Sequence, residues 1–260
     1  MSKKLVVLIF ALFLFLQKGK AQFFSNEIGV YAGPAFFFSD YGQRNDFGTN
    51  IGNTGFNIGI VHYMNFSYTR NYSLRESRFK YFKNHFKIRN ELSYTKVNLQ
   101  HYGDYVDESK TSVLAQQLRG MRGQSTIFSV GTNLEYYPFS LRAFEYGYPR
   151  LAPHIGIGVG FNFYTPEATS ELGVMGDPRI TPQKYIDAFT NESGSVLSVV
   201  GTLGARYKIT RSEDLLLNLT WRHFFSDWID GINPDKNLYP ENKSNDWVFG
   251  INVGYIFYLE

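Results

Sequence analysis

The fold is decided by the stretch His154-Ile155-Gly156-Ile157-Gly158-Val159-Gly160-Phe161-Asn162-Phe163, in which every second residue is apolar. The positions between them hold only histidine, glycine and asparagine. A repeat of two is the period of a β-strand, whose successive side chains point to opposite faces of the sheet. The stretch therefore predicts a strand with one apolar face and one small, polar face.

Seven further segments alternate in the same way, at about 27–33, 56–66, 86–94, 128–136, 195–209, 215–222 and 247–257. Most of them run for about 10 residues or more, longer than the 5 or 6 usual for strands of globular proteins. That length is enough for a strand that crosses a membrane at a tilt. We predict an all-β fold: an eight-stranded antiparallel transmembrane β-barrel.

A soluble lipocalin-like barrel is the competing interpretation, because its strands alternate too, with the apolar face inside. Aromatic residues favour the membrane class, since they recur near both ends of the apolar faces, as at the two membrane interfaces. They are Phe56, Phe163, Trp221 and Trp247 at one end, and Phe66, Tyr136, Tyr207 and Phe257 at the other. The polar faces are also rich in glycine, which suits the crowded interior of a small barrel.

The lengths of the connections favour the membrane class as well. If the first strand runs outward, the outward connections are long, at about 37–55, 101–125, 165–194 and 225–245. The inward ones, at about 69–84, 138–152 and 210–213, are shorter on average, and the last is a tight turn. Outer-membrane barrels combine short periplasmic turns with long external loops in this way.

Residues 1–21 have the pattern of a cleaved signal peptide. Lys3 and Lys4 precede an apolar run from Leu5 to Leu16, and Gly19 and Ala21 place small residues at the cleavage site. The run is too short for a membrane-spanning helix, which needs about 20 apolar residues, so a transmembrane anchor is the disfavoured alternative. We expect an exported chain whose mature part, 22–260, is an outer-membrane barrel with long external loops.

The amino-acid composition limits the classes of partner that the chain can bind. The chain has no cysteine, so hydrogen bonds and packing alone hold the fold. The formal net charge is +3, but Lys3, Lys4, Lys18 and Lys20 leave with the signal peptide, which gives +3 − 4 = −1 for the mature chain. A weakly acidic chain has no compositional support for nucleic-acid binding.

The last strand ends in the pattern Asn252-x-Gly254-x-x-Phe257-x-Leu259. This resembles the C-terminal signal by which the barrel-assembly machinery recognises its substrates, although the last strand of a soluble barrel can show similar spacing. We therefore expect contacts with that machinery through the last strand, and with outer-membrane lipid and lipopolysaccharide around the barrel.

Charged residues are expected inside the barrel, on the same faces as the glycines: Arg89, Arg206 and Arg222, with Glu27, Glu91 and Glu135. Eight strands enclose a space that side chains just fill. Isolated charges would be costly there, so we predict a buried network of ion pairs. An ion path through the lumen is the disfavoured alternative.

We assign no catalytic, cofactor-binding or metal-binding residue. The histidines form no HxxxH or HExxH pair. The three glycines at 156, 158 and 160 share one face of a strand and precede no helix, unlike a nucleotide loop. A lipid-modifying enzyme at the outer rim is the alternative, with two candidate groups: His223, Ser226 and Asp227, or His101, Asp104 and Asp107.

Two external loops are acidic, with Asp227, Asp230, Asp235 and Glu241 in the fourth and Asp40 and Asp46 in the first. Their spacing is irregular and matches no EF-hand. We interpret them as solvated loop residues, with calcium or lipopolysaccharide-bridging cations as the alternative.

The connection 69–84 is the most unusual. It contains one acid, Glu76, and the basic residues Arg70, Arg75, Arg78, Lys80 and Lys83. Aromatic residues are interleaved with them: Tyr72, Phe79, Tyr81 and Phe82. One interpretation is a docking element for a periplasmic or membrane protein. The other is an elongated strand pair whose cations snorkel to an anionic interface.

Four segments carry a resemblance to a known family: 27–33, 40–42, 53–60 and 85–92. They resemble the opening of PorG-like small outer-membrane barrels, found in gliding bacteria and their relatives with type IX secretion. The resemblance covers about the first hundred residues. It implies a barrel without known catalysis, one relative of which serves the secretion machine beside a periplasmic ring; many members have no assigned role.

The sequence thus predicts a monomeric, non-enzymatic barrel that acts as a scaffold or accessory component, in type IX protein secretion or gliding if the resemblance holds. The rim-sited lipid enzyme and a surface adhesin that uses the loops 165–194 and 225–245 remain as alternatives.

Overall fold

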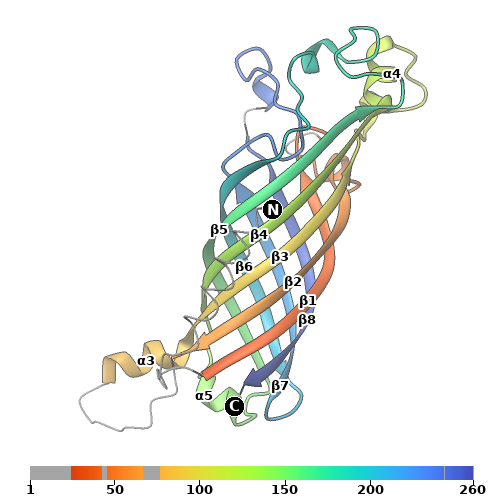
Figure 1. Ribbon diagram of the computed structural model, residues 1–260. Helices are drawn as coiled ribbons and strands as arrows, with labels where there is room; N and C mark the ends of the chain where they lie inside the picture. The colour runs from red at the N-terminus through yellow and green to blue at the C-terminus, as the bar shows by residue number, and fades with distance from the viewer. Residues whose placement is uncertain (1–24, 43–45, 67–76, 243, 260) are drawn as a thin grey trace, which may run out of the picture.

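The computed structural model describes residues 25–42, 46–66, 77–242 and 244–259 and shows a closed, tilted β-barrel (Figure 1). The eight antiparallel strands are β1 (Ser25–Phe38), β2 (Thr54–Asn65), β3 (Phe86–Leu99), β4 (Met121–Tyr136), β5 (Leu151–Ser170), β6 (Gly194–Lys208), β7 (Glu213–Phe224) and β8 (Trp247–Leu259). Each pairs with the next, and β8 pairs with β1 to close the ring. All eight predicted strands are confirmed, most with longer bounds.

The rows of paired residues climb the wall because the strands are tilted. One row starts at Phe257 of β8 and passes through Ile28, His62, Asn90, Thr132, Val159, Val199 and His223 before it returns to β8 at Trp247. One circuit therefore shifts the register from residue 257 to residue 247, which is the stagger that closes the barrel. The two aromatic residues at its ends mark the lower and the upper edge of the outer wall.

The barrel wall is apolar outside and polar inside. On β5, Ile155, Ile157 and Val159 are 58%, 66% and 57% exposed, while His154 on the opposite face is 2% exposed. A soluble barrel would reverse these faces, so the outer surface is one that lipid must cover. Transmembrane β-barrels of this type lie in outer membranes, and this chain is an outer-membrane protein. Among the described residues, the helices are all too short or too polar to cross a membrane.

Long and short connections lie at opposite ends of the barrel. The external loops 39–53, 100–120, 171–193 and 225–246 carry the helices α2 (Phe47–Asn50) and α4 (Val113–Gly120), and the short 3-10 turns η2 (Asp104–Val106), η3 (Gln183–Tyr185) and η4 (Pro240–Asn242). The periplasmic connections carry α3 (Ser77–His85) and α5 (Leu141–Glu145), and the turn 209–212 is tight. The start of β1 and the end of β8 lie at this short-loop end.

The β4–β5 hairpin rises above the rest of the barrel at the external end (Figure 1). Its pairing continues to Met121 opposite Ser170, and α4 caps it. Residues of the third and fourth external loops pack against this extension. The predicted signal peptide, residues 1–21, lies outside the described residues.

Candidate functional site

Paired charges fill the lumen near the periplasmic end. The Glu27 carboxylate lies 2.5 Å from the Lys87 Nζ and 2.7 Å from an Arg206 nitrogen. On its other side, Arg206 lies 2.5 Å from Asp214, which also accepts from Lys208 at 2.8 Å. None of these side chains is more than 5% exposed. Each buried charge therefore has a partner of opposite sign, which low-dielectric surroundings require.

A second ionic group lies higher in the lumen. Arg89 bonds Glu91 at 2.6 Å and approaches Glu135 at 3.5 Å. Glu91 also accepts from Arg222 at 3.0 Å, so it lies between two guanidinium groups. The predicted pairing of the three arginines with the three glutamates is confirmed.

The external part of the lumen is closed by amide and then by apolar side chains. Asn57 of β2 donates to Asn252 of β8 at 3.2 Å, over the inner face of β1. Above this level, Ile229 and Ile232 of the fourth loop join a buried apolar cluster with Phe37 and Phe224 of the strands. The described residues thus fill the lumen at three levels. The predicted structural role of the charges is confirmed, and the ion path loses its support.

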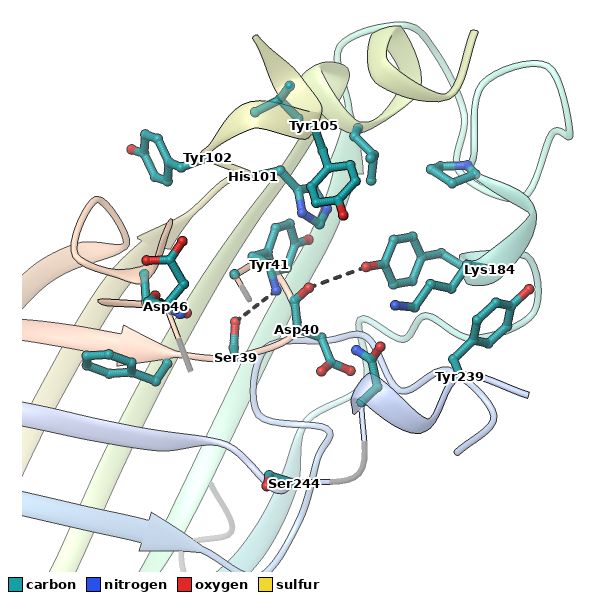
Figure 2. Close-up of a pocket in the computed structure, with 18 of the residues that line it drawn as sticks. Ser39, Asp40, Tyr41, Asp46, His101, Tyr102, Tyr105, Lys184, Tyr239 and Ser244 are labelled. Atoms are coloured by element: carbon teal, nitrogen blue, oxygen red, sulfur yellow. Dashed lines mark hydrogen bonds between the residues drawn. The ribbon is translucent and has the colours of Figure 1, made fainter. Parts of the chain in front are cut away.

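An external pocket of about 1100 Å³ lies above this apolar cluster. Each external loop contributes to it: Asp40 and Tyr41 from the first, His101 and Tyr105 from the second, Lys184 and Tyr185 from the third, and Tyr239 and Asn242 from the fourth. Figure 2 shows side chains from all four loops converging, among them Asp40, Tyr41, His101, Tyr105, Lys184 and Tyr239. We call this cavity the external pocket.

Aromatic rings dominate the chemistry of the external pocket. The Tyr185 hydroxyl donates to the Asp40 carbonyl at 3.3 Å (Figure 2). The Lys184 ammonium lies 5.6 Å from the ring centroid of Tyr185 and 5.3 Å from that of Tyr239, within cation–π range. The Tyr105 side chain is 67% exposed, so part of the aromatic surface is open to a ligand.

The His101 ring packs between Tyr41 and Tyr185, with centroid distances of 5.0 and 5.9 Å. Burial lowers the pKa of His101 to about 4, so the ring is neutral at physiological pH. A neutral ring packed between two tyrosines is part of the wall. The arrangement offers stacking faces, amides and hydroxyls, which suit binding.

Acidic residues of the first and fourth loops meet beneath the external pocket. Asp230 accepts from the Asp40 backbone N–H at 3.0 Å, and Asp246 accepts from the backbone N–H groups of Ile229 and Asp230 at 3.0 and 3.2 Å. Burial and the neighbouring carboxylates raise the pKa of both Asp230 and Asp246 well above its ordinary value. We call Asp40, Asp227, Asp230 and Asp246 the acidic cluster.

The expectation that these loop acids are solvated is wrong for Asp227 and Asp230, which are 3% and 0% exposed. They are buried because the fourth loop folds into the barrel mouth. Asp46 instead caps α2, where it accepts from the Gly48 N–H at 2.8 Å. The side chain of Glu241 lies outside the described part. In the described ranges, no three histidine, aspartate or glutamate side chains are grouped to hold a metal ion.

The candidate catalytic groups are not assembled. The His223 ring packs on the outer wall against Trp221 and Phe225, at 6.0 Å from each centroid. Asp227 is buried on the inner side, 3.2 Å from the Lys236 ammonium. In the second loop, the ring of His101 is buried in the pocket wall, whereas Asp104 and Asp107 are exposed.

At the periplasmic end, the predicted docking element is partly described, because residues 67–76 lie outside the described residues. The rest forms α3, so the elongated strand pair is wrong for 77–85. The Tyr81 hydroxyl lies 2.8 Å from that of Tyr136, and Phe82 stacks on Phe86 at 4.6 Å. The aromatic side of α3 therefore adds to the lower aromatic edge of the barrel, while the helix extends sideways from its end (Figure 1).

Comparisons with known proteins find other outer-membrane barrels. No protein-family model matches the sequence, and no curated protein matches it. The chain is similar to the solved structures of Neisserial surface protein A (TM-score 0.45, 11% identity, 90% of this chain and 97% of the other) and of a major outer membrane protein from Thermus thermophilus (0.45, 16%, 90% and 99%). A third is OprG from Pseudomonas aeruginosa (0.40, 13%, 91% and 98%). At such identities the similarity is one of fold.

Proposed function

We propose that this chain is a non-enzymatic scaffold or accessory component of the outer membrane, which acts through the elements at its two ends. The observation that carries the proposal is the filled lumen, since paired charges and the inserted fourth loop occupy the path that a pore would need. The elements that barrel closure does not require lie at the two ends of the barrel: the external loops, the tall β4–β5 hairpin and α3.

The finer proposal is a role in type IX protein secretion or gliding, which rests on the resemblance of residues 27–33, 53–60 and 85–92. The docking element would be the connection 69–84. In its support, α3 places Lys83 at the periplasmic interface beside exposed Tyr81 and Phe82, which are 54% and 38% exposed. A partner with an acidic surface fits a segment of this charge.

Crosslinking in intact cells, followed by mass spectrometry, tests this role. We expect a periplasmic or membrane partner to be recovered with the native chain. It should be lost when Arg70, Arg75, Arg78, Lys80 and Lys83 are replaced by alanine. Replacing the external cations Lys110 and Arg179 by alanine is the matched control and should leave the partner in place. Equal recovery from both variants would refute docking through 69–84.

A surface adhesin is the second candidate, and the external pocket favours it. Rings such as Tyr105 offer flat faces to the C–H groups of a sugar, and amides such as Asn242 offer hydrogen bonds to its hydroxyls. The side-chain oxygen of Asn242 is buried and without a hydrogen-bond partner among the described residues. A neutral saccharide fits this lining, because rings and amides contact the C–H groups and hydroxyls of a sugar.

We expect Tyr105→Ala to weaken binding of the cells to saccharide-coated surfaces by about 10-fold, the effect of about 1.4 kcal/mol of lost stacking. Tyr146→Ala is the control, since Tyr146 is 81% exposed at the periplasmic end. Binding that is unchanged in both variants would remove the adhesin candidate and leave the scaffold proposal standing.

A further inference from the structure

The lipid-facing wall carries a short row of polar side chains where apolar ones are expected. His62, Asn90 and Thr132 are direct cross-strand neighbours on β2, β3 and β4. All three belong to the outward-facing positions of their strands, next to apolar residues such as Ile60 and Leu92. We call His62, Asn90 and Thr132 the polar row.

The polar row lies deep in the membrane. Asn90 is four residues from Phe86 and four from Tyr94, the aromatic residues toward the two edges of β3. Thr132, its neighbour, is midway along the row that climbs from Phe257 to Trp247. An amide at this depth faces hydrocarbon, which offers no hydrogen bond and makes its exposure costly.

The row is only partly satisfied within the barrel. The His62 ring lies 3.0 Å from the Asn26 side-chain oxygen and 3.4 Å from the Asn90 amide nitrogen. Both hydrogen bonds of Asn90 use that nitrogen, the second toward the Met64 sulfur at 3.7 Å. Among the described residues the side-chain oxygen of Asn90 has no hydrogen-bond partner, so it is available to a donor outside the barrel.

A depression of about 500 Å³ adjoins the polar row on the same wall. It is lined by the row and by outward-facing apolar residues that include Ile60, Val130 and Phe161. Within a membrane, small and polar residues mark the contacts between protein surfaces. A concave patch with a polar edge therefore suits close packing against a second protein surface. We call the polar row and this depression together the β2–β5 face.

We propose that the β2–β5 face is the contact surface of a dimer with a second copy of this chain in the membrane. All copies insert in the same orientation, so a two-fold axis along the membrane normal brings each residue opposite its own counterpart at the same depth. The Asn90 N–H that contacts the Met64 sulfur at 3.7 Å makes only a weak bond, so it can donate instead to the Asn90 side-chain oxygen of the other copy, and the two amides pair. This proposed dimer differs from the monomer that the sequence predicted.

The absence of cysteine makes the test clean, since a single introduced thiol is the only one in the chain. Thr132→Cys in native membranes, treated with a short bifunctional thiol crosslinker, should give a dimer band of two identical chains. Val253→Cys is the matched control, because Val253 is 60% exposed at a similar depth on β8, across the barrel from β4. It should give at least 10-fold less dimer.

Asn90→Leu in the Thr132→Cys background should reduce the dimer band by about 10-fold while the barrel still assembles. If that variant fails to assemble, His62→Leu takes its place with the same expectation. A thiol at 132 that gives no dimer, equal yields from Thr132→Cys and Val253→Cys, a crosslink to a different protein, or a yield unaffected by the leucine variants would each overturn the proposal.

Discussion

Replacing Glu91 by glutamine is expected to lower the free energy of unfolding by about 3–5 kcal/mol, the cost of breaking a buried ion pair on one side. Glu91 is the carboxylate between Arg89 and Arg222, at 2.6 and 3.0 Å. Arg89 retains Glu135, but Arg222 is left with the Ser93 and Ser129 hydroxyls. A guanidinium group cannot lose its proton to avoid the cost of an unpaired buried charge, whereas a buried lysine can.

Urea unfolding in lipid vesicles measures this loss. Asp177→Asn is the control, because Asp177 pairs with Arg179 at 2.6 Å where the arginine side chain is 87% exposed, and such pairs contribute about 0–1 kcal/mol. Combining Glu91→Gln with Arg222→Met should recover most of the stability, since no unpaired charge remains. A loss in Glu91→Gln no larger than in the control would show that the lumen is hydrated and the network weak.

The second large effect is expected at the acidic cluster, as a loss of packing of the fourth loop when the pH rises. Burial and the neighbouring carboxylates raise the pKa of Asp230 and Asp246, so the packed loop favours their protonated forms. For an acid with a raised pKa, the stabilisation is complete below the ordinary pKa and is lost as the pH rises through the raised one. Asp40 and Asp227 face the same cluster, and Lys236 pairs with Asp227.

Hydrogen exchange of residues 225–246, corrected for the intrinsic pH dependence of the rate, follows this opening. Between the ordinary and the raised pKa of these carboxyl groups, protection should fall by up to about 10-fold per pH unit for each titrating group. Asp246→Asn keeps an acceptor for the Ile229 and Asp230 N–H groups and removes one charge, so protection should persist to higher pH. Protection that rises with pH, or a variant that behaves like the native chain, would contradict the buried, protonated cluster.

The barrel could be predicted from the sequence because each strand carries its own evidence. Alternation along a segment such as 154–163 fixes both the strand and its outward face, since the period of two is local. The same rule identified Arg89, Arg206 and Arg222 as inward-facing. It missed Asp214, because the predicted seventh strand began at 215, one residue after this ligand of Arg206 and Lys208.

The external pocket and the acidic cluster could not be predicted, because they depend on contacts between distant loops. The Asp40 N–H donates to Asp230, 190 residues away in the chain, and Ser125 of β4 donates to the carbonyl of Ile229 at 2.6 Å. No local pattern indicates which loop folds into the barrel mouth. The polar row was missed for a similar reason, since Asn90 and Thr132 are neighbours only through the register of β3 and β4.

The central claim is that lipid covers the apolar stripe of every strand. Leu217 tests it most directly, since it is 52% exposed on the outer face of β7. In a chain whose three tryptophans are replaced by phenylalanine, Leu217→Trp should place one indole within the hydrocarbon. In vesicles of lipids brominated along the acyl chains, we expect its fluorescence to be strongly quenched. Emission that is unaffected by the bromines would show that this stripe does not touch lipid.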